Sequence, residues 1–233
     1  MKNLTKITIL LAAMMIFSAK THAQVSVQVN IAPPAIPEYT QPPCPEDGYL
    51  WEPGYWNWDP NANDYYWVPG VWVAPPSSGL LWTPPYWDFV NGVYAFHAGY
   101  WGPHVGYYGG INYGNGYLGI GFAGGAWSGG HFRYNTAAWN VDRTRVHNVY
   151  VDRTVIQKHT IGQNHISYHG PHPEEVPAAR EKHVQVTAEQ QSHVQAARAD
   201  HSQFHSVNHG NPSRPAMSRV GGGQRGGGGH GKH

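Results

Sequence analysis

One short pattern recurs four times between residues 48 and 101, and it limits what this chain can fold into. Residues 51–56 read Trp-Glu-Pro-Gly-Tyr-Trp, and residues 67–72 read Trp-Val-Pro-Gly-Val-Trp. Two diverged copies follow at 82–87 and 96–101. The copies start 16, 15 and 14 residues apart. Such a repeat predicts small units that bury their apolar faces only by packing on one another. The residues that define the pattern are Trp51, Gly54, Trp56, Trp67, Gly70, Trp72, Trp82, Trp87, Gly99 and Trp101.

Glycine and proline recur so closely in this region that a helix is excluded. The aromatic and β-branched residues between them favour short strands. Pro53-Gly54 and Pro69-Gly70 suit a type II turn, which would place the two tryptophans of one motif opposite each other. If Pro-Gly is instead a bulge within a longer strand, the chain reverses at 60–64, 76–79 and 91–92. Both alternatives predict a mainly β fold, an antiparallel meander of aromatic-rich hairpins.

Residues 1–23 predict a secretory signal peptide, with lysines at the start, an apolar run and a small-residue cleavage site before Gln24. The apolar run is shorter than the roughly 20 residues that span a bilayer, so we expect no transmembrane helix in the mature chain. Loss of Lys2, Lys6 and Lys20 leaves 12 Lys plus Arg against 14 Asp plus Glu, a formal charge of −2. This balance argues against nucleic acid as a partner. We expect a periplasmic, outer-membrane-associated or secreted protein.

The segments around the repeats differ in composition. Residues 24–47 predict a strand with alternating valines, followed by a Pro-rich linker that spaces rather than packs. Cys44, the single cysteine, cannot form an intramolecular disulfide and is interpreted as an incidental loop thiol. Residues 102–169 predict further strands, first Gly/Tyr-rich and then Val/Thr-rich, with short extended rungs at the two Val-Asp-Arg-Thr sequences from residues 141 and 151.

Residues 170–233 predict a tail that is helical and then disordered. One or two short, exposed helices are expected before residue 204, because the apolar stripe there is thin. Thr187 and Gln190 have the spacing of a capping box for the second helix. Residues 208–233 are rich in Gly, Ser, Pro and His, a composition that predicts disorder.

The two intact motifs resemble the WXXGXW repeat family of exported bacterial proteins, also called YXWGXW. The Gly/Tyr-rich segment over residues 99–114 and the Glu/Ala/Arg/His-rich tail are similar to a subgroup of this family. The third motif departs from the pattern because Pro85 replaces glycine, and the fourth because Phe96 replaces tryptophan. These departures concern the turn geometry of the two copies. The resemblance implies an exported repeat protein and carries no catalytic residue with it.

Repeated aromatic residues can form either a core or a ligand surface. Fixed spacing favours rings that pack on one another, and the region has few aliphatic residues with which to build a core. Tyrosine and tryptophan faces also stack on sugar rings. Trp58 and Tyr66 lie off the main pattern, so they are the candidates for stacking on a glycan.

Histidines are concentrated in the second half of the chain, where 13 of the 16 lie at or after residue 131. His201 and His205 would share a face if one helix covers both, and two imidazoles at that spacing can chelate a divalent metal. A solvated polar tail is the alternative, because neither cysteine nor carboxylate completes a ligand set. Beyond weak divalent metal binding we expect no cofactor. The candidate ligands are His165, His169, His172, His201 and His205.

The sequence contains no serine elbow, no His-Glu-x-x-His and no paired Cys/His nucleophile. We therefore expect a non-enzymatic exported repeat protein of the bacterial cell envelope, which acts as a structural or interaction module. Its partner would be an envelope glycan or another envelope protein. The alternatives are a carbohydrate- or peptidoglycan-binding module that uses exposed aromatic residues, and a metal-binding histidine tail.

Overall fold

A computed structural model describes residues 27–154, 170–173 and 175–221. The expected signal peptide and the candidate ligands His165 and His169 lie outside the described residues. The repeat region consists of short strands, and none of the helices in the described ranges is long and apolar enough to cross a bilayer. The strands are β2 (Leu50–Glu52), β3 (Tyr55–Asp59), β4 (Asp64–Val68), β5 (Gly70–Val73), β6 (Leu81–Thr83), β7 (Tyr86–Val90), β8 (Val93–His97) and β9 (Tyr100–Gly102).

Two consecutive motifs form one long antiparallel hairpin. In the first hairpin, β2 and β3 run outward and β4 and β5 return, so that β3 pairs with β4 and β2 with β5. Trp51 therefore lies opposite Trp72, and Trp56 lies opposite Trp67. The second hairpin repeats this arrangement, with β7 paired to β8 and β6 to β9. Opposite residues thus come from different motifs.

The Pro-Gly step is a break within a longer strand, and the type II turn alternative is wrong. The chain reverses between β3 and β4, between β5 and β6 and between β7 and β8, as the bulge alternative predicts. Gly54 and Gly70 do not have a positive φ. A Cβ atom on Gly54 would instead lie 2.3 Å from Cζ2 of Trp67, and one on Gly70 would lie 2.5 Å from Cζ2 of Trp51. Glycine is required because an indole ring covers the backbone there.

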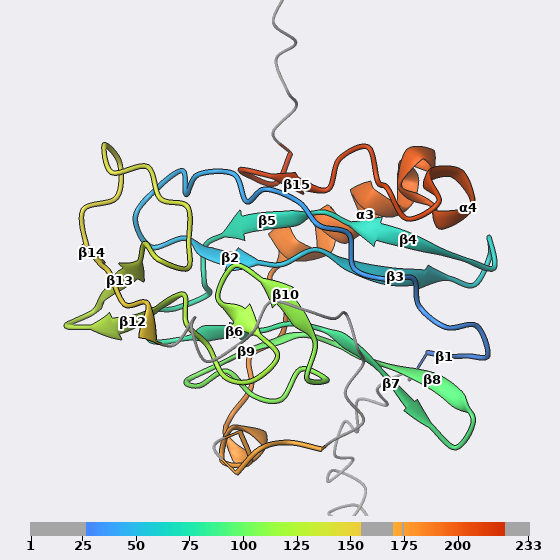
Figure 1. The fold of residues 1–233 in the computed structure, drawn as a ribbon, viewed down its shortest axis with the longest axis horizontal. Helices are drawn as coiled ribbons and strands as arrows, with labels where there is room; N and C mark the ends of the chain where they lie inside the picture. The colour runs from blue at the N-terminus through green and yellow to red at the C-terminus, as the bar shows by residue number, and fades with distance from the viewer. Residues whose placement is uncertain (1–26, 155–169, 174, 222–233) are drawn as a thin grey trace, which may run out of the picture.

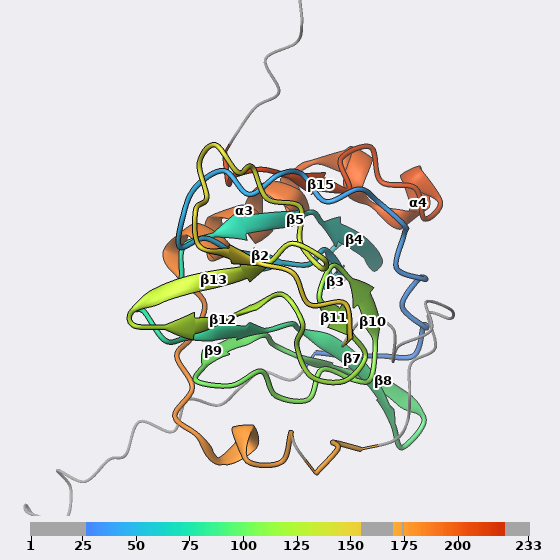
Figure 2. The same ribbon diagram turned by 60° about the vertical axis from the view of Figure 1, so that its left-hand side comes forward.

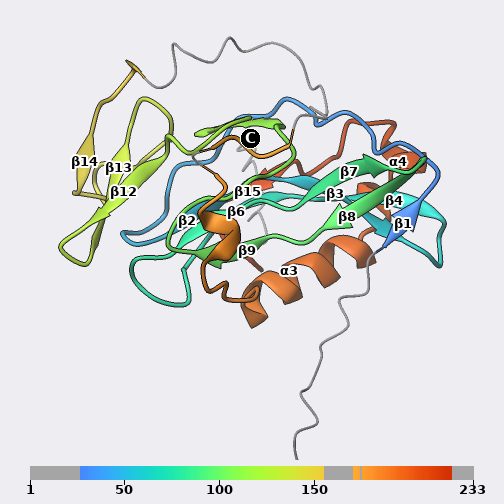
Figure 3. The same cartoon turned by 90° about the horizontal axis from the view of Figure 1, so that it is seen from below.

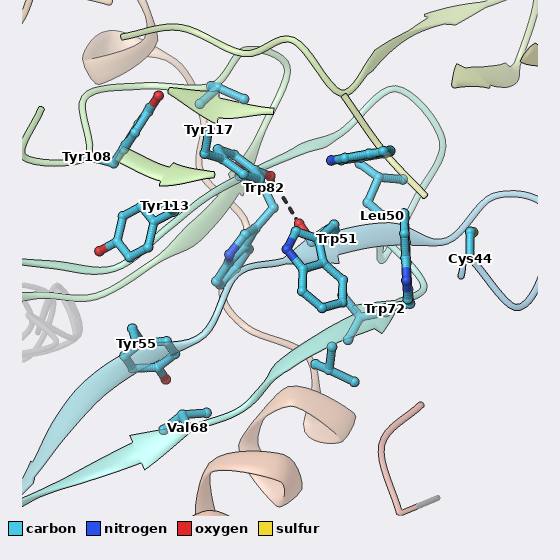
Figure 4. Packing of buried hydrophobic residues seen from close by; sticks show 14 of the residues in the cluster. Cys44, Leu50, Trp51, Tyr55, Val68, Trp72, Trp82, Tyr108, Tyr113 and Tyr117 are labelled. Carbon is cyan, nitrogen blue, oxygen red and sulfur yellow. Dashed lines mark hydrogen bonds between the residues drawn. The ribbon is translucent and has the colours of Figure 1, made fainter. Parts of the chain in front are cut away.

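The first hairpin lies over the second, as Figures 1 and 2 show. The indole nitrogen of Trp87 donates a hydrogen bond to the carbonyl oxygen of Trp56, 2.8 Å away, which joins the two hairpins. The hydroxyl group of Tyr117 lies 3.2 Å and 3.0 Å from the carbonyl oxygens of Trp51 and Trp82 (Figure 4). Aromatic side chains therefore stabilise the core between the hairpins both by packing and by donating hydrogen bonds to backbone carbonyl groups.

The N-terminal segment packs against the repeats. Strand β1 (Gln28–Val29) forms within the segment of alternating valines and adds to β8. The expectation that the Pro-rich linker only spaces is wrong, because the linker supplies acceptors for buried indoles: Trp56 donates to the carbonyl of Ala35 and Trp72 to that of Pro42. Cys44 is fully buried. Burial raises the pKa of its thiol to about 12.

The Gly/Tyr-rich region continues as two small sheets. Gly129 and Gly130 form the reversal of a hairpin, in which Ser128 lies opposite His131. The extended rung predicted at the first Val-Asp-Arg-Thr sequence is wrong, because Asp142 accepts hydrogen bonds from Thr144 and closes a turn. Asp152 accepts the same two hydrogen bonds from Thr154, and the rest of the second predicted rung lies outside the described residues. The strands are β10 (Asn112–Gly114), β11 (Tyr117–Leu118), β12 (Gly125–Ser128), β13 (His131–Asn135) and β14 (Val149–Tyr150).

The C-terminal segment wraps around the hairpins. Helix α3 (Ala188–Ala199) begins with the predicted Thr187–Gln190 capping box. It is not exposed on all sides but lies along the stacked hairpins (Figure 3). The disorder predicted from residue 208 does not hold up to residue 221, and residues 222–233 lie outside the described residues. The remaining elements are η1 (Ala178–Arg180), η2 (His201–Gln203), α4 (His205–Asn208) and β15 (Ala216–Met217), which pairs with β5.

Candidate functional site

The tryptophans of the repeat motif form the interior of the protein. Each of them is at most 4% exposed. The opposing rings of Trp51 and Trp72 have centroids 5.3 Å apart, and Trp56 and Trp67 are 5.2 Å apart. Trp82 and Trp101 repeat this contact in the second hairpin. The motif tryptophans therefore pack on one another, and their faces are not accessible to a ligand.

The two residues proposed to stack on a glycan lie in different surroundings. Tyr66 is 3% exposed and its ring packs against Phe204, so it is not accessible to a sugar. Trp58 is half-buried, with its ring edge-on to Tyr65 at 4.9 Å. The structure does not bring Trp58 and Tyr66 together into one binding surface, because they lie on adjacent strands at diagonal positions and Tyr66 faces the core.

The candidate histidine ligands that the structure describes are dispersed. Helix α3 ends at Ala199, so His201 and His205 do not share a face of one helix. The ring of His205 packs edge-on against Trp56, and the backbone nitrogen of His172 donates to the carboxylate of Glu175. Among the described residues, no group of three or more His, Cys, Asp or Glu side chains could hold a metal ion.

The first motif carries a buried acid at the position that follows its first tryptophan. In the second and third motifs this position holds Val68 and Thr83, which are almost fully buried in their strands. In the first motif it holds Glu52, which is only 3% exposed. Charged side chains are rarely buried to this extent unless they are paired. Glu52 thus departs from the local pattern, as residues at functional sites often do.

Gln190 of helix α3 connects Glu52 to the second hairpin. Its amide nitrogen donates a hydrogen bond to Oε2 of Glu52 at 2.8 Å, in a buried contact. Its amide oxygen accepts a hydrogen bond from the indole of Trp101 at 2.8 Å. Burial raises the pKa of the Glu52 carboxyl group to about 7, and the hydrogen bond from Gln190 offsets part of that rise. The carboxyl group therefore titrates close to neutral pH.

Glu52 lines a cleft of about 340 Å³ between the two hairpins and helix α3. The hairpins contribute aromatic walls, including Tyr55 and Phe96, whose rings are stacked at 6.2 Å. Helix α3 contributes the amide side chains of Gln190, Gln191 and Gln195. Among the described residues that line this cleft, Glu52 is the only carboxyl group, and there is no Lys, Arg or His. The cleft therefore combines rings, amides and one acid.

Polar contacts also fix the position of helix α3, which forms one wall of the cleft. His193 is 3% exposed, and its Nε2 lies 2.7 Å from the carbonyl oxygen of Pro69. Arg198 donates two hydrogen bonds to Asp59, at 2.6 Å and 2.8 Å. The guanidinium group lowers the pKa of that carboxyl. These contacts explain why a helix with a thin apolar stripe still packs on the sheet.

Sequence reasoning did not single out the Glu52 cleft. The available signal was the charged residue in Trp-Glu-Pro-Gly, where the next copy has valine. Its importance depends on burial by helix α3, which lies 138 residues further along the chain. A local pattern of aromatic residues does not contain that information.

The paired aromatic hairpins define a β-rich repeat protein whose tryptophans form its core. The WXXGXW repeat model matches residues 47–73 and 78–101, so this chain contains two copies of that repeat. Each matched copy corresponds to one complete hairpin, which contains two tryptophan motifs. Neither the curated proteins nor the solved structures include a match to this chain.

Proposed function

We propose that this protein is a non-enzymatic, exported interaction module of the bacterial cell envelope, and that it holds one sugar unit of a glycan in the Glu52 cleft. One observation supports this most strongly: a buried carboxyl group shares the cleft with stacked aromatic rings and amide side chains. Carboxylate and amide groups hydrogen-bond hydroxyl groups, and the apolar face of a sugar packs on aromatic rings. Export itself is proposed from residues 1–23 of the sequence.

The composition of the cleft also predicts which sugars it accepts. The described lining contains no cationic side chain that could neutralise an acidic sugar. Above its pKa of about 7, the Glu52 carboxylate repels an anion and attracts an amine. Neutral and amine-bearing sugars are therefore favoured over uronic acids. Glycoside hydrolysis commonly uses two carboxyl groups, whereas the described lining has one, so we propose binding without cleavage.

Isothermal titration of the full chain at pH 8 tests this proposal. The titrants are glucosamine, N-acetylglucosamine and glucuronic acid. We expect saturable binding of the first two and no binding of glucuronic acid. Absence of binding for all three sugars would overturn the proposal, and so would a preference for glucuronic acid.

Two variants connect binding to the cleft. Glu52→Gln keeps the shape and removes the charge, so glucosamine should bind at least about tenfold more weakly, since a desolvated charge pair contributes more than a neutral hydrogen bond. Glu38→Gln, at an exposed carboxyl group, is the matched control and should bind as the wild type does. Circular dichroism confirms that both variants are folded. Equal affinity of the Glu52 variant would show that any sugar binds elsewhere.

A further inference from the structure

The outer edge of β5 is occupied by the C-terminal part of the same chain. Strand β15 pairs with it in parallel, with Ala216 opposite Gly70 and Met217 opposite Val71 (Figure 1). The carbonyl oxygen of Pro215 accepts hydrogen bonds from the backbone nitrogen of Gly70 and from the indole of Trp67, both at 3.0 Å. The first hairpin is therefore built to pair with an extended strand at this edge.

This segment does not fill the space beneath it. A cavity of about 280 Å³ lies between Met217 and Val220 of the segment and the body of the protein, where Pro69, His193 and Gln203 line it. Gln203 is 1% exposed, and neither polar atom of its amide has a hydrogen-bond partner of good geometry among the described residues, although an interaction with Gln203 helps to lower the pKa of the Asp200 carboxyl group. Buried polar groups are usually paired, so an unpaired amide beside a cavity indicates an imperfect fit.

The side-chain contacts that hold the segment are partly solvated. Ala216 and Met217 are only half-buried. The ion pair between Arg219 and Glu46 has a short distance of 2.6 Å, but both side chains are about half exposed, at 45% and 56%. Exposed ion pairs contribute little to stability. We therefore expect residues 214–221 to detach locally more readily than the hairpin strands do.

We propose that the outer edge of β5 and the adjoining cavity form a peptide-binding groove, which residues 214–221 occupy as an internal substitute. The partner is an extended segment of another polypeptide that adds as a strand parallel to β5 and carries a carboxamide side chain at the place of Met217. Main-chain pairing gives such a groove its affinity, and side-chain pockets give it specificity. Two amide groups are complementary because each offers a donor and an acceptor, so the incoming side chain would pair Gln203.

Fluorescence anisotropy with two labelled peptides tests the proposal. One peptide has the sequence of residues 211–221, and the other differs by Met217→Gln. The receptor is the full chain with Met217→Asp, which places a charge in the cavity and releases the internal segment. We expect this variant to bind both peptides, and the Gln peptide about fivefold more tightly. The wild-type chain should bind both more weakly, because its own segment competes at a high effective concentration.

Matched variants separate the groove from general exposure of apolar surface. Ser218→Asp adds the same charge at an exposed neighbouring position and should behave as the wild type does. Adding Gln203→Leu to the Met217→Asp chain should remove the preference for the Gln peptide and retain binding of the other. If the folded Met217→Asp chain binds neither peptide, or if the preference survives Gln203→Leu, the proposal is wrong. The groove is separate from the Glu52 cleft, so Glu52→Gln should leave peptide binding unchanged.

Discussion

The contact between glycine and tryptophan within each hairpin can be tested by adding a single methyl group. Gly54→Ala would place Cβ 2.3 Å from Cζ2 of Trp67 and 2.9 Å from the backbone nitrogen of Gly70. Neither neighbour can move easily. The Trp67 ring is fully buried, and its centroid lies 5.2 Å from that of Trp56. Its indole nitrogen donates a hydrogen bond to the carbonyl oxygen of Pro215. The added methyl group therefore has no space to occupy.

The expected cost follows from the behaviour of tightly packed interiors. Extra carbon atoms in a filled core cost about 1–3 kcal/mol, and more where the surroundings are rigid. Because one contact is with a fixed ring and the other with backbone, we expect Gly54→Ala to lower the free energy of unfolding by about 3 kcal/mol or more. Gly170→Ala is the matched control: no atom lies within 4 Å of its added Cβ and its φ is ordinary, so its effect should stay within about 0.5 kcal/mol.

The second hairpin shows how the contact can be relieved. By position in the motif, Pro85 corresponds to Gly54 and Phe96 corresponds to Trp67. In the first hairpin the residues at these two positions, Gly54 and Trp67, contact each other. In the second hairpin both positions are replaced, the glycine by proline and the tryptophan by phenylalanine. A smaller ring accompanies a larger residue at the glycine position, which suggests that the two substitutions compensate. The same compensation should be reproducible in the first hairpin.

Urea unfolding of four proteins measures this coupling: wild type, Gly54→Ala, Trp67→Phe and the double variant. Trp67→Phe alone should destabilise, because it leaves a cavity and removes the bond to Pro215. The double variant should be more stable than the sum of the single effects predicts, by about 1–2 kcal/mol. Strictly additive effects, or a Gly54→Ala protein as stable as the wild type, would refute the argument that the glycine is required by the ring.

Three further measurements examine other parts of the structure. Folding raises the pKa of Glu52 from 4.5 to about 7, so the free energy of unfolding should fall by up to about 3 kcal/mol as pH rises through this range. Urea titrations at pH 5 and pH 8 measure this fall, and Glu52→Gln should abolish it. Tyr117→Phe should lower the free energy of unfolding by about 1–3 kcal/mol, because buried carbonyl oxygens of both hairpins lose a donor; an unchanged midpoint would contradict this. The Cys44 thiol, buried and with its pKa raised to about 12, should resist alkylation at pH 8 in the native protein and react in denaturant, and rapid native labelling would contradict its burial.

Much of the fold follows from the spacing of particular residues. The tryptophans at residues 51, 67 and 82, with Pro-Gly between them, predict short strands that bury aromatic rings, and the structure confirms this. The capping box at Thr187 is also confirmed. These features depend on interactions between residues close together in the chain, or on a periodic pattern, and for that reason they can be recognised in sequence.

The candidate site could not be predicted in the same way. Glu52 becomes a buried acid only because Gln190 reaches it from a helix near the other end of the chain. Tyr66, expected to be accessible, is covered by Phe204 of the same C-terminal segment. From composition the Pro-rich linker is expected to be a spacer and the end of the tail to be disordered, yet they supply carbonyl groups to the indoles of Trp56, Trp67 and Trp72. Such pairings depend on which segment covers each buried donor.

The amino-acid pattern sets the units of this protein: glycine where a ring must cover the backbone, aromatic residues on both sides of it, and reversals where the loops are polar. The pattern leaves open which tryptophans face each other, because a Pro-Gly step can form either a turn or a break in a longer strand. Packing of whole hairpins resolves that choice in favour of the break. The same packing, with the C-terminal segment laid across it, creates the Glu52 cleft, because burial and hydrogen bonding there depend on residues brought together only when the chain is folded.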